Sequence, residues 1–558
     1  RTRGAQGMAI EDVTLDVTHG LIGLEGGNGS GGGHTNVTII GGKIGFDGSA
    51  TQPTPSITGF TFIDQTEHAI LYRGRHTLNA TGIEITSKHP ITAVKAVDLW
   101  MQDETSTDQL NGSKDQGLFC WNGPVNFVDC EVNFTERAGT AFASNCGVYL
   151  NNCYVRNAKV LVDHTDGGKL IGKTGKWVQI KEYAQGYNMR SFQSLKYTSP
   201  IYVNGKKQDQ EIAEIAPGVG PPDDLVSRHV WSDDFPSWQS PGAVNVKNPP
   251  YHAKGDCVTD DTHAIQKAID ENEIVFVPAG LYRITKTIDL KSNTKLIGLM
   301  PNITGLVVVE AEGDFAAAHH PQPILRTPND ADGTTVIAFI GTWTHGGNAC
   351  YNLVWRVGRR SIIRDWMVMH TQMELAEERT HKSVVVTGNG GGRWYNYYDE
   401  TWSREYRPSY RHLYVEGTSE PFRIYQCNPE HARSEANMEI RNAQNVTLYG
   451  VKGEGNYPIV LIRHCDNIRI FGYGGNAPPW PHTSVYLVED STNLLVANMF
   501  NQVRTHEGKG LDGFGGPNVD PNLWHMFIER FPDGRELRTP PLERPVLYKH
   551  GTTRDVWE

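Results

Sequence analysis

Three stretches near the C-terminal end decide the fold: Ala443-Gln-Asn-Val-Thr-Leu-Tyr449, Cys465-Asp-Asn-Ile-Arg-Ile-Phe471 and Ser491-Thr-Asn-Leu-Leu-Val496. Each places an asparagine directly before a short apolar strand. The aligned asparagines Asn445, Asn467 and Asn493 are separated by 22 and 26 residues. A period in the low twenties, with one strand and one turn per repeat, is typical of a parallel β-helix, in which each coil lies about 4.8 Å above the last.

The first half of the chain carries the same kind of repeat. Val125-Asn-Phe-Val-Asp-Cys130 is echoed 23 residues later by Val148-Tyr-Leu-Asn-Asn-Cys153. Leu78 begins a similar strand 47 residues before Val125, which we interpret as two periods. Leucine-rich repeats share the period but need a leucine ladder, which is absent. A β-sandwich with accidental echoes is the less favoured alternative, because its strands alternate in direction. We therefore expect an all-β chain whose equivalent residues stack, Asn on Asn and Cys on Cys.

The repeat is interrupted from about residue 172 to residue 250, where proline and charged residues increase. Then Gly255-Asp-Cys-Val-Thr-Asp-Asp-Thr262 precedes a stretch with helical spacing of Ile265, Ala268 and Ile269, and Asp261 or Thr262 is a good N-cap. We expect this helix to cover the open end of a second coil, because a bare sheet edge recruits other chains. The fold class is thus two tandem right-handed parallel β-helices in one chain. The predicted parts are a first β-helix (1–171), a linker packing along the coils (172–250), a second β-helix with a capping helix (251–530) and a C-terminal extension (531–558).

Composition narrows the possible partners. The 558 residues carry a net charge of -11, which disfavours nucleic acid and polyanionic glycans unless a local basic cleft or a metal intervenes. No apolar run of eighteen residues occurs, so no membrane span is predicted. The eight cysteines form no CxxC pair, which argues against zinc, and we expect neither a metal nor another cofactor. A monomer is expected.

The chain opens within a β pattern and without a visible signal peptide, so we expect that N-terminal residues are missing. Seven N-x-S/T sequons permit a secreted, extracellular glycoprotein. They are Asn28, Asn36, Asn79, Asn111, Asn133, Asn302 and Asn445.

The stretch from Gly255 through Ile284, "GDCVTDDTHAIQKAI…VFVPAGLYRI", resembles the opening of the pectate-lyase-like superfamily. The wider arrangement, with "GSGGGHTNVTIIGGKIGF" in a preceding coil and a linker containing "FPSWQSPGAVNVKN", resembles glycoside hydrolase family 55, the exo-β-1,3-glucanases. This resemblance implies an inverting hydrolase of β-1,3-glucan. It extends over most of the chain through layout and short motifs.

The resemblance also assigns candidate residues. Asn428-Pro-Glu-His431 matches the family's Glu-His pair, and Lys452-Gly-Glu-Gly-Asn-Tyr-Pro458 matches its downstream glutamate. It implies that Glu454 is the general acid and that Glu430 supports it. The wording after Glu430 departs from the family pattern, which leaves the substrate open. The implied or inferred sugar-binding residues are Gln52, which would hold the attacking water, and His431, Trp394, Tyr398, Trp402, Tyr457 and Trp480.

Spacing gives an independent reason to pair the two glutamates. They lie 24 residues apart, which is one coil, so outward-pointing carboxyls would be about 5 Å from each other. One pKa then rises, as a general acid requires near neutral pH. Aromatic residues in the segment before Glu430 can pack against the apolar faces of sugar rings. Two alternatives stay open: a lyase acting on an acidic glycan, with Arg433 or Arg463 as base, and a non-catalytic carbohydrate-binding or tailspike-like protein.

Overall fold

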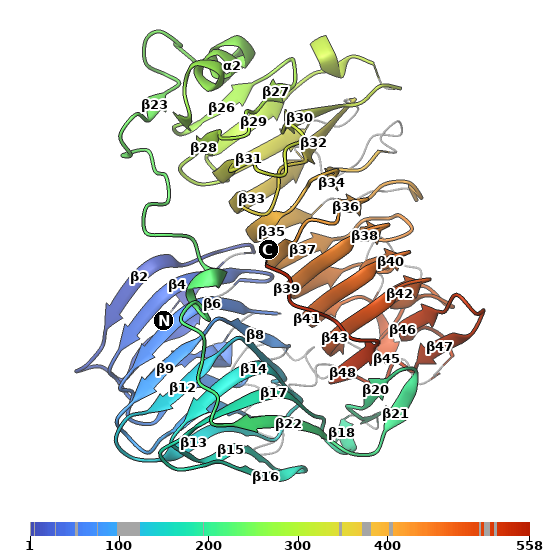
Figure 1. Ribbon diagram of the computed structural model, residues 1–558. Coiled ribbons are helices and arrows are strands. Elements are labelled where there is room, and N and C mark those ends of the chain that lie inside the picture. Colours follow the sequence, from blue (N-terminus) through green and yellow to red (C-terminus); the bar gives the residue numbers. More distant parts are fainter. Residues whose placement is uncertain are drawn as a thin grey trace.

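The chain forms two β-helices of mostly parallel strands that lie side by side, with the C-terminus between them (Figure 1). The computed structural model describes residues 2–557 except 5, 28, 51–53, 75, 98–122, 193–194, 318, 345–348, 371–380, 401–405, 502–503, 507–513, 518–519 and 521. Within this part the two tandem parallel β-helices predicted from the repeat are confirmed. No helix among these residues is long and apolar enough to cross a membrane.

The first β-helix is built from two sheets. One sheet contains, in spatial order, β1 (Thr2–Arg3), β3 (Ile22–Gly27), β5 (Ile44–Asp47), β7 (His68–Tyr72), β10 (Thr92–Ala96), β13 (Gly139–Ser144), β15 (Ala158–His164) and β16 (Gly168–Ile171). The other contains β2 (Glu11–Asp16), β4 (Gly33–Ile40), β6 (Ser56–Ile63), β8 (Leu78–Thr81), β9 (Glu84–Ser87), β11 (Val125–Val128), β12 (Glu131–Phe134), β14 (Val148–Arg156), β17 (Trp177–Gln185) and β22 (Ile212–Pro217).

The second β-helix also has two large sheets. The larger contains β21 (Lys206–Gln208), β20 (Ile201–Val203), β48 (Leu547–His550), β43 (Thr492–Asn501), β41 (Asp466–Asn476), β39 (Gln444–Glu454), β37 (Phe422–Glu430), β35 (Gly392–Glu400), β33 (Ile362–His370), β31 (Val336–Thr344), β28 (Lys295–Ile297), β25 (Ile274–Phe276) and β23 (Val244–Asn245), joined through β31 by β29 (Thr304–Val308), β26 (Gly280–Arg283) and β24 (Asp256–Asp260). The other contains β27 (Ile288–Asp289), β30 (Gln322–Arg326), β32 (Cys350–Trp355), β34 (Val384–Thr387), β36 (Leu413–Glu416), β38 (Met438–Arg441), β40 (Val460–Arg463), β42 (Ser484–Glu489), β46 (His525–Arg530) and β47 (Glu536–Thr539).

Short elements complete the described chain. They are the helix α2 (Thr262–Glu271), the 3-10 turns η1 (Gly48–Ala50), η4 (Ser227–His229) and η5 (Gly313–Phe315), and the strand pairs β18 (Arg190–Phe192) with β19 (Leu195–Tyr197) and β44 (Arg504–His506) with β45 (Phe514–Pro517).

The stacking predicted from the repeat is confirmed. Asn445, Asn467 and Asn493 occupy equivalent positions on β39, β41 and β43, and the Asn467 side chain donates to Asn445 Oδ1 at 2.8 Å. Cys130 and Cys153 are likewise equivalent in the first coil. One interpretation is wrong: Leu78 pairs directly with Val125, so their separation is one coil and not two. β9 and β10 have equivalents in β12 and β13 of the next turn, so the additional length is the segment 98–122, which lies outside the described residues.

Each β-helix has a row of bends at equivalent positions of successive coils. In the second β-helix the bend residues have positive φ, from 47° to 83°, and they divide each long strand into two arms. They are Phe339, Asp365, Asn396, Gln426, Gly450, Gly472 and Asn498. Because one residue at each bend takes the left-handed conformation, side chains in the second arm lose the alternation of the first arm. This bend ladder, defined by those seven residues, decides which later residues face outward.

The two β-helices meet along the bend ladder. Ser56 of the first coil donates its hydroxyl to Gln426 at 2.6 Å, and Asn498 donates to Asn126 at 2.8 Å. A Cβ at Gly472 would collide with the Asn79 side chain, so close approach of the coils requires glycine there. Polar side chains therefore fix the register between the coils.

An aromatic stack lies on the first arm of the second coil, facing the linker. Tyr395, Tyr425 and Tyr449 stack with centroids 4.8 Å apart, and Phe471 continues the stack at 5.4 Å. His229 of the linker contacts the stack, with Nδ1 2.8 Å from the Tyr425 hydroxyl. The linker therefore packs between the two β-helices. It also contributes strands, since β17 and β22 extend a sheet of the first β-helix and β20 joins a sheet of the second.

The helix α2 buries Ile265, Ala268 and Ile269 as predicted. Asp261 occupies the N-cap position, but its side chain makes no capping hydrogen bond. Its carboxylate instead accepts from the backbone N–H groups of Lys254 and Gly255 at 2.7 and 2.8 Å. The acidic opening motif thus ties the chain entering the second coil to the helix.

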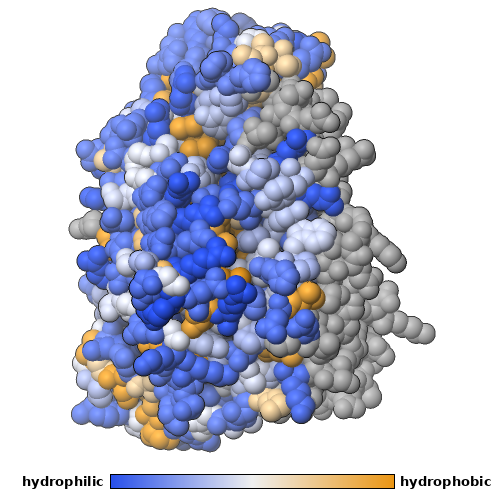
Figure 2. All heavy atoms as spheres, turned by 90° about the vertical axis from the view of Figure 1, so that its right-hand side faces the viewer, coloured by the Kyte–Doolittle hydropathy of each residue, from blue (hydrophilic) through white to orange (hydrophobic). Residues whose placement is uncertain are grey.

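The outer face of the second sheet is mostly hydrophilic (Figure 2). Equivalent positions on five successive strands carry a ladder of charged residues of both signs: Glu416, Arg441, Arg463, Glu489 and Arg530. Arg463 contacts Glu489 at 2.6 Å, and Arg530 contacts the other oxygen of the same carboxylate. Since these arginines already have acidic neighbours, this face offers little attraction to a polyanion.

Candidate functional site

Three carboxylates lie at equivalent positions in the second arms of successive strands. Glu400 on β35 pairs with Glu430 on β37, and the register of β37 with β39 places Glu430 beside Glu454. The next strand continues the row with Asn476. The structure thus brings Glu430 and Glu454 together as the 24-residue interval predicted, and it adds Glu400.

Lys452 is the main site residue that sequence reasoning missed. Its side chain is fully buried, and its ammonium group contacts both Glu430 and, at 2.7 Å, Glu454. It lies two residues before Glu454, on the same side of β39, because side chains alternate along a strand. A lysine in the otherwise small and apolar run Gly450-Val-Lys-Gly453 was the available signal.

His431 joins the carboxylates on their open side. Its Nε2 lies 3.5 Å from Glu400, 3.6 Å from Glu430 and 3.7 Å from Glu454. The residue has a positive φ of 64°, and its backbone N–H donates to the Glu454 carbonyl at 2.9 Å. That bond fixes the imidazole over the row of carboxylates, so the predicted role of His431 at the site has a geometric basis.

Burial sets the acid–base properties of the cluster. Burial raises the pKa of Glu430 to about 7, with the charge of Lys452 opposing the rise and that of Glu454 adding to it. Burial alone would lower the pKa of Lys452, but the charges of Glu430 and Glu454 raise it above its ordinary value. The cluster therefore holds an ammonium group beside a carboxyl that exchanges its proton near neutral pH.

Exposure separates the two glutamates. The Glu430 side chain is fully buried, whereas 22% of the Glu454 side chain is exposed. A substrate can therefore reach the Glu454 carboxyl but not that of Glu430.

Asn428, between Tyr398 and Lys452 in the register, is buried, and its amide has no hydrogen-bond partner among the described residues. A buried unpaired amide normally has a water or ligand group beside it.

The prediction that Trp394 binds substrate is wrong. Trp394 is fully buried inside the coil, where its ring packs edge-on against Trp355 at 5.7 Å and Phe422 at 5.0 Å. The bend at Asn396 changes the alternation of side chains, so Trp394 points inward although Tyr398 points outward. Trp394 therefore belongs to the core.

Tyr398 lies at the site, as predicted. Its hydroxyl donates to Glu400, and it is 3.2 Å from the Gln6 side chain. Its ring lines a cavity of about 240 Å³ between the N-terminal segment and the second coil. Tyr398 therefore connects the carboxylate row to a space that borders it.

Two further predicted aromatic residues are Tyr457, three residues after Glu454, and Trp480, which follows one turn of the β-helix later. Tyr457 stacks on Tyr406 with centroids 5.2 Å apart and lies 6.4 Å from the Trp480 ring. The backbone N–H of Trp480 donates to the Asn456 carbonyl at 2.9 Å. These partly exposed rings form an aromatic row, Tyr406, Tyr457 and Trp480, on the segments that follow the site strands.

Two predicted residues, Gln52 and Trp402, lie outside the described residues. Thr54, which follows Gln52 by two positions, donates its hydroxyl to the Gly474 carbonyl at 2.8 Å. Gly474 pairs with Lys452 across β39 and β41. The first β-helix therefore contacts β41, the strand next to the one that carries Glu454.

Glu400, Glu430 and His431 have the composition of a weak metal site, since their ligand atoms lie within 4.8 Å of one another. The Lys452 ammonium group contacts Glu430, however, and a cation there would be repelled by it. The geometry favours proton chemistry over metal binding at these residues.

Residues 243–341 match the family model described as Rhamnogalacturonase A/epimerase, pectate lyase-like. The chain is 49% identical over 55 residues to the Pre-neck appendage protein of Bacillus phage phi29, which covers 10% of this chain and 6% of that protein. It is 30% identical over 138 residues to a probable glucan endo-1,3-beta-glucosidase of Arthroderma benhamiae, which covers 24% of this chain and 14% of that protein. The chain thus spans 14% or less of the length of these curated relatives.

Two solved structures resemble this chain at low sequence identity. SacteLam55A from Streptomyces sp. SirexAA-E has a TM-score of 0.37 at 10% identity, covering 93% of this chain and 91% of that one. Full-length tailspike protein 2 of Escherichia coli O157:H7 bacteriophage CAB120 has a TM-score of 0.35 at 13% identity, covering 51% of this chain and 42% of that one. Scores this low establish neither a shared activity nor a shared substrate.

Proposed function

We propose that this protein is a glycoside hydrolase of β-glucan, acting on chain ends of β-1,3-glucan with inversion, and that Glu454 is its general acid. The observation that carries the proposal is the pair of carboxylates, Glu430 and Glu454, sharing the buried ammonium group of Lys452 beside the aromatic row. Glycosidic cleavage needs a carboxylic acid at the leaving oxygen, and sugar rings pack on aromatic faces.

The exposure of the two glutamates assigns their roles. Glu454 is the partly exposed carboxyl and donates the proton to the glycosidic oxygen. Glu430 is buried and cannot touch the substrate, so it acts as a positioning residue that holds a proton near neutral pH. His431 lies within 3.7 Å of both carboxylates and keeps them oriented.

Two findings outside the site support the choice of substrate. The layout and motifs of the sequence resemble glycoside hydrolase family 55. A partial relative is named as a probable glucan endo-1,3-beta-glucosidase. Because a polymeric glucan is met outside the cell, we further propose that the protein is secreted. The Asn302 sequon is exposed in the structure, whereas that of Asn79 is buried.

A lyase acting on an acidic glycan is less well supported. Arg463, one candidate base, is held by Glu435 and Glu489. The Lys452 ammonium group lies where a calcium ion would need the Glu430 carboxylate. A lyase also leaves an unsaturated product, so its absorbance distinguishes it from a hydrolase.

The test is sugar release from laminarin by the wild type, Glu454→Gln and the matched control Glu214→Gln, an exposed glutamate on β22. We expect Glu454→Gln to lose at least about 100-fold in kcat, the usual contribution of general acid catalysis, and Glu214→Gln to match the wild type. Release of glucose alone indicates attack at chain ends, and proton NMR of the first-formed anomer tests inversion. Equal release by Glu454→Gln and wild type would refute the assignment.

A further inference from the structure

A groove outside the candidate site lies between the linker and both β-helices. It has a volume of about 570 Å³, within the usual range for ligand sites. Its lining comes from the linker stretch 231–238, from β2 and β4 of the first β-helix, and from β28 with residues 298–299, β31 and β33 of the second. The groove contains none of the residues of the candidate catalytic site.

One part of the groove is aromatic. Trp238 is 52% exposed, an unusually large exposure for a tryptophan, and Phe276 packs behind it with centroids 6.0 Å apart. Phe235 and Phe339 lie nearby and cover the Arg364 guanidinium at 4.9 and 4.8 Å. The groove thus offers an open indole face supported from below.

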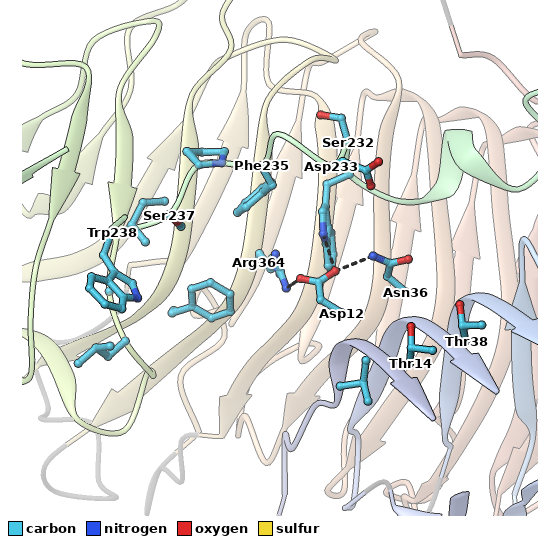
Figure 3. Close-up of a pocket in the computed structure, with 17 residues that line it drawn as sticks. Asp12, Thr14, Asn36, Thr38, Ser232, Asp233, Phe235, Ser237, Trp238 and Arg364 are labelled. Carbon is cyan, nitrogen blue, oxygen red and sulfur yellow. Dashed lines mark hydrogen bonds and ion pairs between the residues drawn. The ribbon is translucent and has the colours of Figure 1, made fainter. Parts of the chain in front are cut away.

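The other part carries hydroxyl groups. Thr14 on β2 and Thr38 on β4 are in register on adjacent parallel strands, so their side chains repeat at about 4.8 Å. Figure 3 shows Trp238 and Phe235 on one side of the Arg364–Asp12 ion pair and the two threonines on the other. Ser232 and Asp233 border the groove from the linker.

The charges of the groove exclude an anionic ligand. Arg364, the cation in its lining, is only 6% exposed and contacts Glu11 at 2.6 Å as well as Asp12. Its guanidinium also lies over Trp231, 3.5 Å from the ring centroid. With Arg364 neutralised and Asp233 exposed, the groove repels uronates and phosphates.

From the exposed indole, the paired hydroxyls and the neutralised arginine we propose that this groove is a second, non-catalytic binding site for a neutral oligosaccharide. A sugar ring would pack its C–H face on Trp238, and the following residues of the chain would exchange hydrogen bonds with Thr14, Thr38 and Asp233. The site does not depend on the chemistry at Glu454; only the choice of glucan probes rests on the proposed function.

The test is calorimetric titration of the full chain carrying Glu454→Gln, so that no probe is cleaved. The probes are laminarihexaose, cellohexaose and, as the acidic comparison, hexagalacturonate. We expect at least one neutral hexasaccharide to bind at a site that Trp238→Ala weakens about tenfold or more, the loss of one stacked aromatic contact. Trp238→Phe should retain most of that binding, and Gln239→Ala, the exposed neighbour outside the groove lining, should retain all of it.

Thr38→Val provides a second variant that does not touch the aromatic part and is expected to weaken the same site. The proposal is overturned if neither Trp238→Ala nor Thr38→Val alters binding of any neutral hexasaccharide, or if hexagalacturonate binds the groove as tightly. Binding that Trp238→Ala weakens, in a protein whose wild type releases no sugar from any glucan, would refute the proposed hydrolase and leave the groove standing.

Discussion

Replacing Lys452 by methionine tests the electrostatic account of the candidate site most directly. Methionine has a similar length but no charge, so the substitution leaves two carboxylates beside an apolar side chain. Removing one partner of a buried ion pair costs about 3 to 5 kcal/mol when the remaining charge stays ionised. Glu430 is fully buried and is the residue that carries most of this cost.

The loss should depend on pH, and its sign follows from the pKa of Glu430. That pKa is already raised, chiefly by burial, to about 7, and without the opposing charge of Lys452 it rises further. A carboxyl whose folded pKa exceeds its unfolded value destabilises the fold as pH rises between the two values, by about 1.4 kcal/mol per pH unit. The wild type already has this slope up to about pH 7, so the variant should resemble the wild type at pH 5. Above pH 7 it should lose about 1.4 kcal/mol more per pH unit, which amounts to about 3 kcal/mol near pH 9.

The assay is thermal unfolding followed by circular dichroism at pH 5, 7 and 9. If the 558 residues unfold together, an unfolding entropy of about 1.2 kcal/mol per kelvin makes this loss a decrease in Tm of about 2 °C at pH 9. Lys43→Met is the matched control, because Lys43 and Glu67 are both about half exposed and such pairs contribute about 0 to 1 kcal/mol.

A double-mutant cycle completes the test. Glu430→Gln removes the charge that Lys452 neutralises, so the double variant should recover a large part of the loss caused by Lys452→Met alone. Additive losses, or a loss of equal size at pH 5 and pH 9, would refute the reasoning that Lys452 stabilises the ionised form of Glu430.

Three further predictions test other parts of the structure. Trp394→Ala should lower the free energy of unfolding by about 3 to 5 kcal/mol in urea titrations. Tyr398→Phe, which loses only the hydroxyl bound to Glu400, should instead lower kcat with little change in stability. The opposite pattern would return Trp394 to the substrate site. In the wild type kcat/KM should fall above about pH 7, because Glu430 loses its proton there. In Glu430→Gln this decrease at high pH should disappear, and an unaltered pH profile would show that the proton on Glu430 does not control the reaction. Asn467→Gly, which tolerates the positive φ but loses the hydrogen bonds to Asn445 and Arg554, should cost about 1 to 3 kcal/mol in thermal unfolding, and a neutral result would show that the asparagine stack does not stabilise the coil.

The repeat predicted the fold because it is a local property of the sequence. Asn445 and Asn467 each start a strand, and a fixed interval between identical turns requires equivalent positions in successive coils. The interval between Leu78 and Val125 misled the count, since an additional segment changes the length of a coil without changing the pairing of its strands. Intervals therefore indicate which strands pair only where no insertion intervenes.

The direction of individual side chains could not be predicted, because it depends on the bend ladder. Alternation places Trp394 and Tyr398 on one face of a straight strand, but the bend at Asn396 separates them. Asparagine and glycine often mark such bends, yet Phe339 and Gln426 occupy two of them. These residues take the left-handed conformation because their neighbours in the ladder do, which no local pattern reveals.

The same ladder explains why a lysine is required at position 452. Equivalent outward positions in the second arms bring Glu400, Glu430 and Glu454 onto adjacent strands about 4.8 Å apart. At an effective dielectric constant of about 20, each neighbouring pair of ionised carboxylates would repel by about 3 kcal/mol. A single ammonium group between Glu430 and Glu454 offsets that repulsion for the pair that it touches. Glu400 lies one strand away and contacts His431 instead, and the row ends at the uncharged Asn476. In this row the buried ammonium group of Lys452 therefore opposes the repulsion only for the carboxylates that it touches, and removing it should raise the pKa of the most deeply buried carboxyl, Glu430, first.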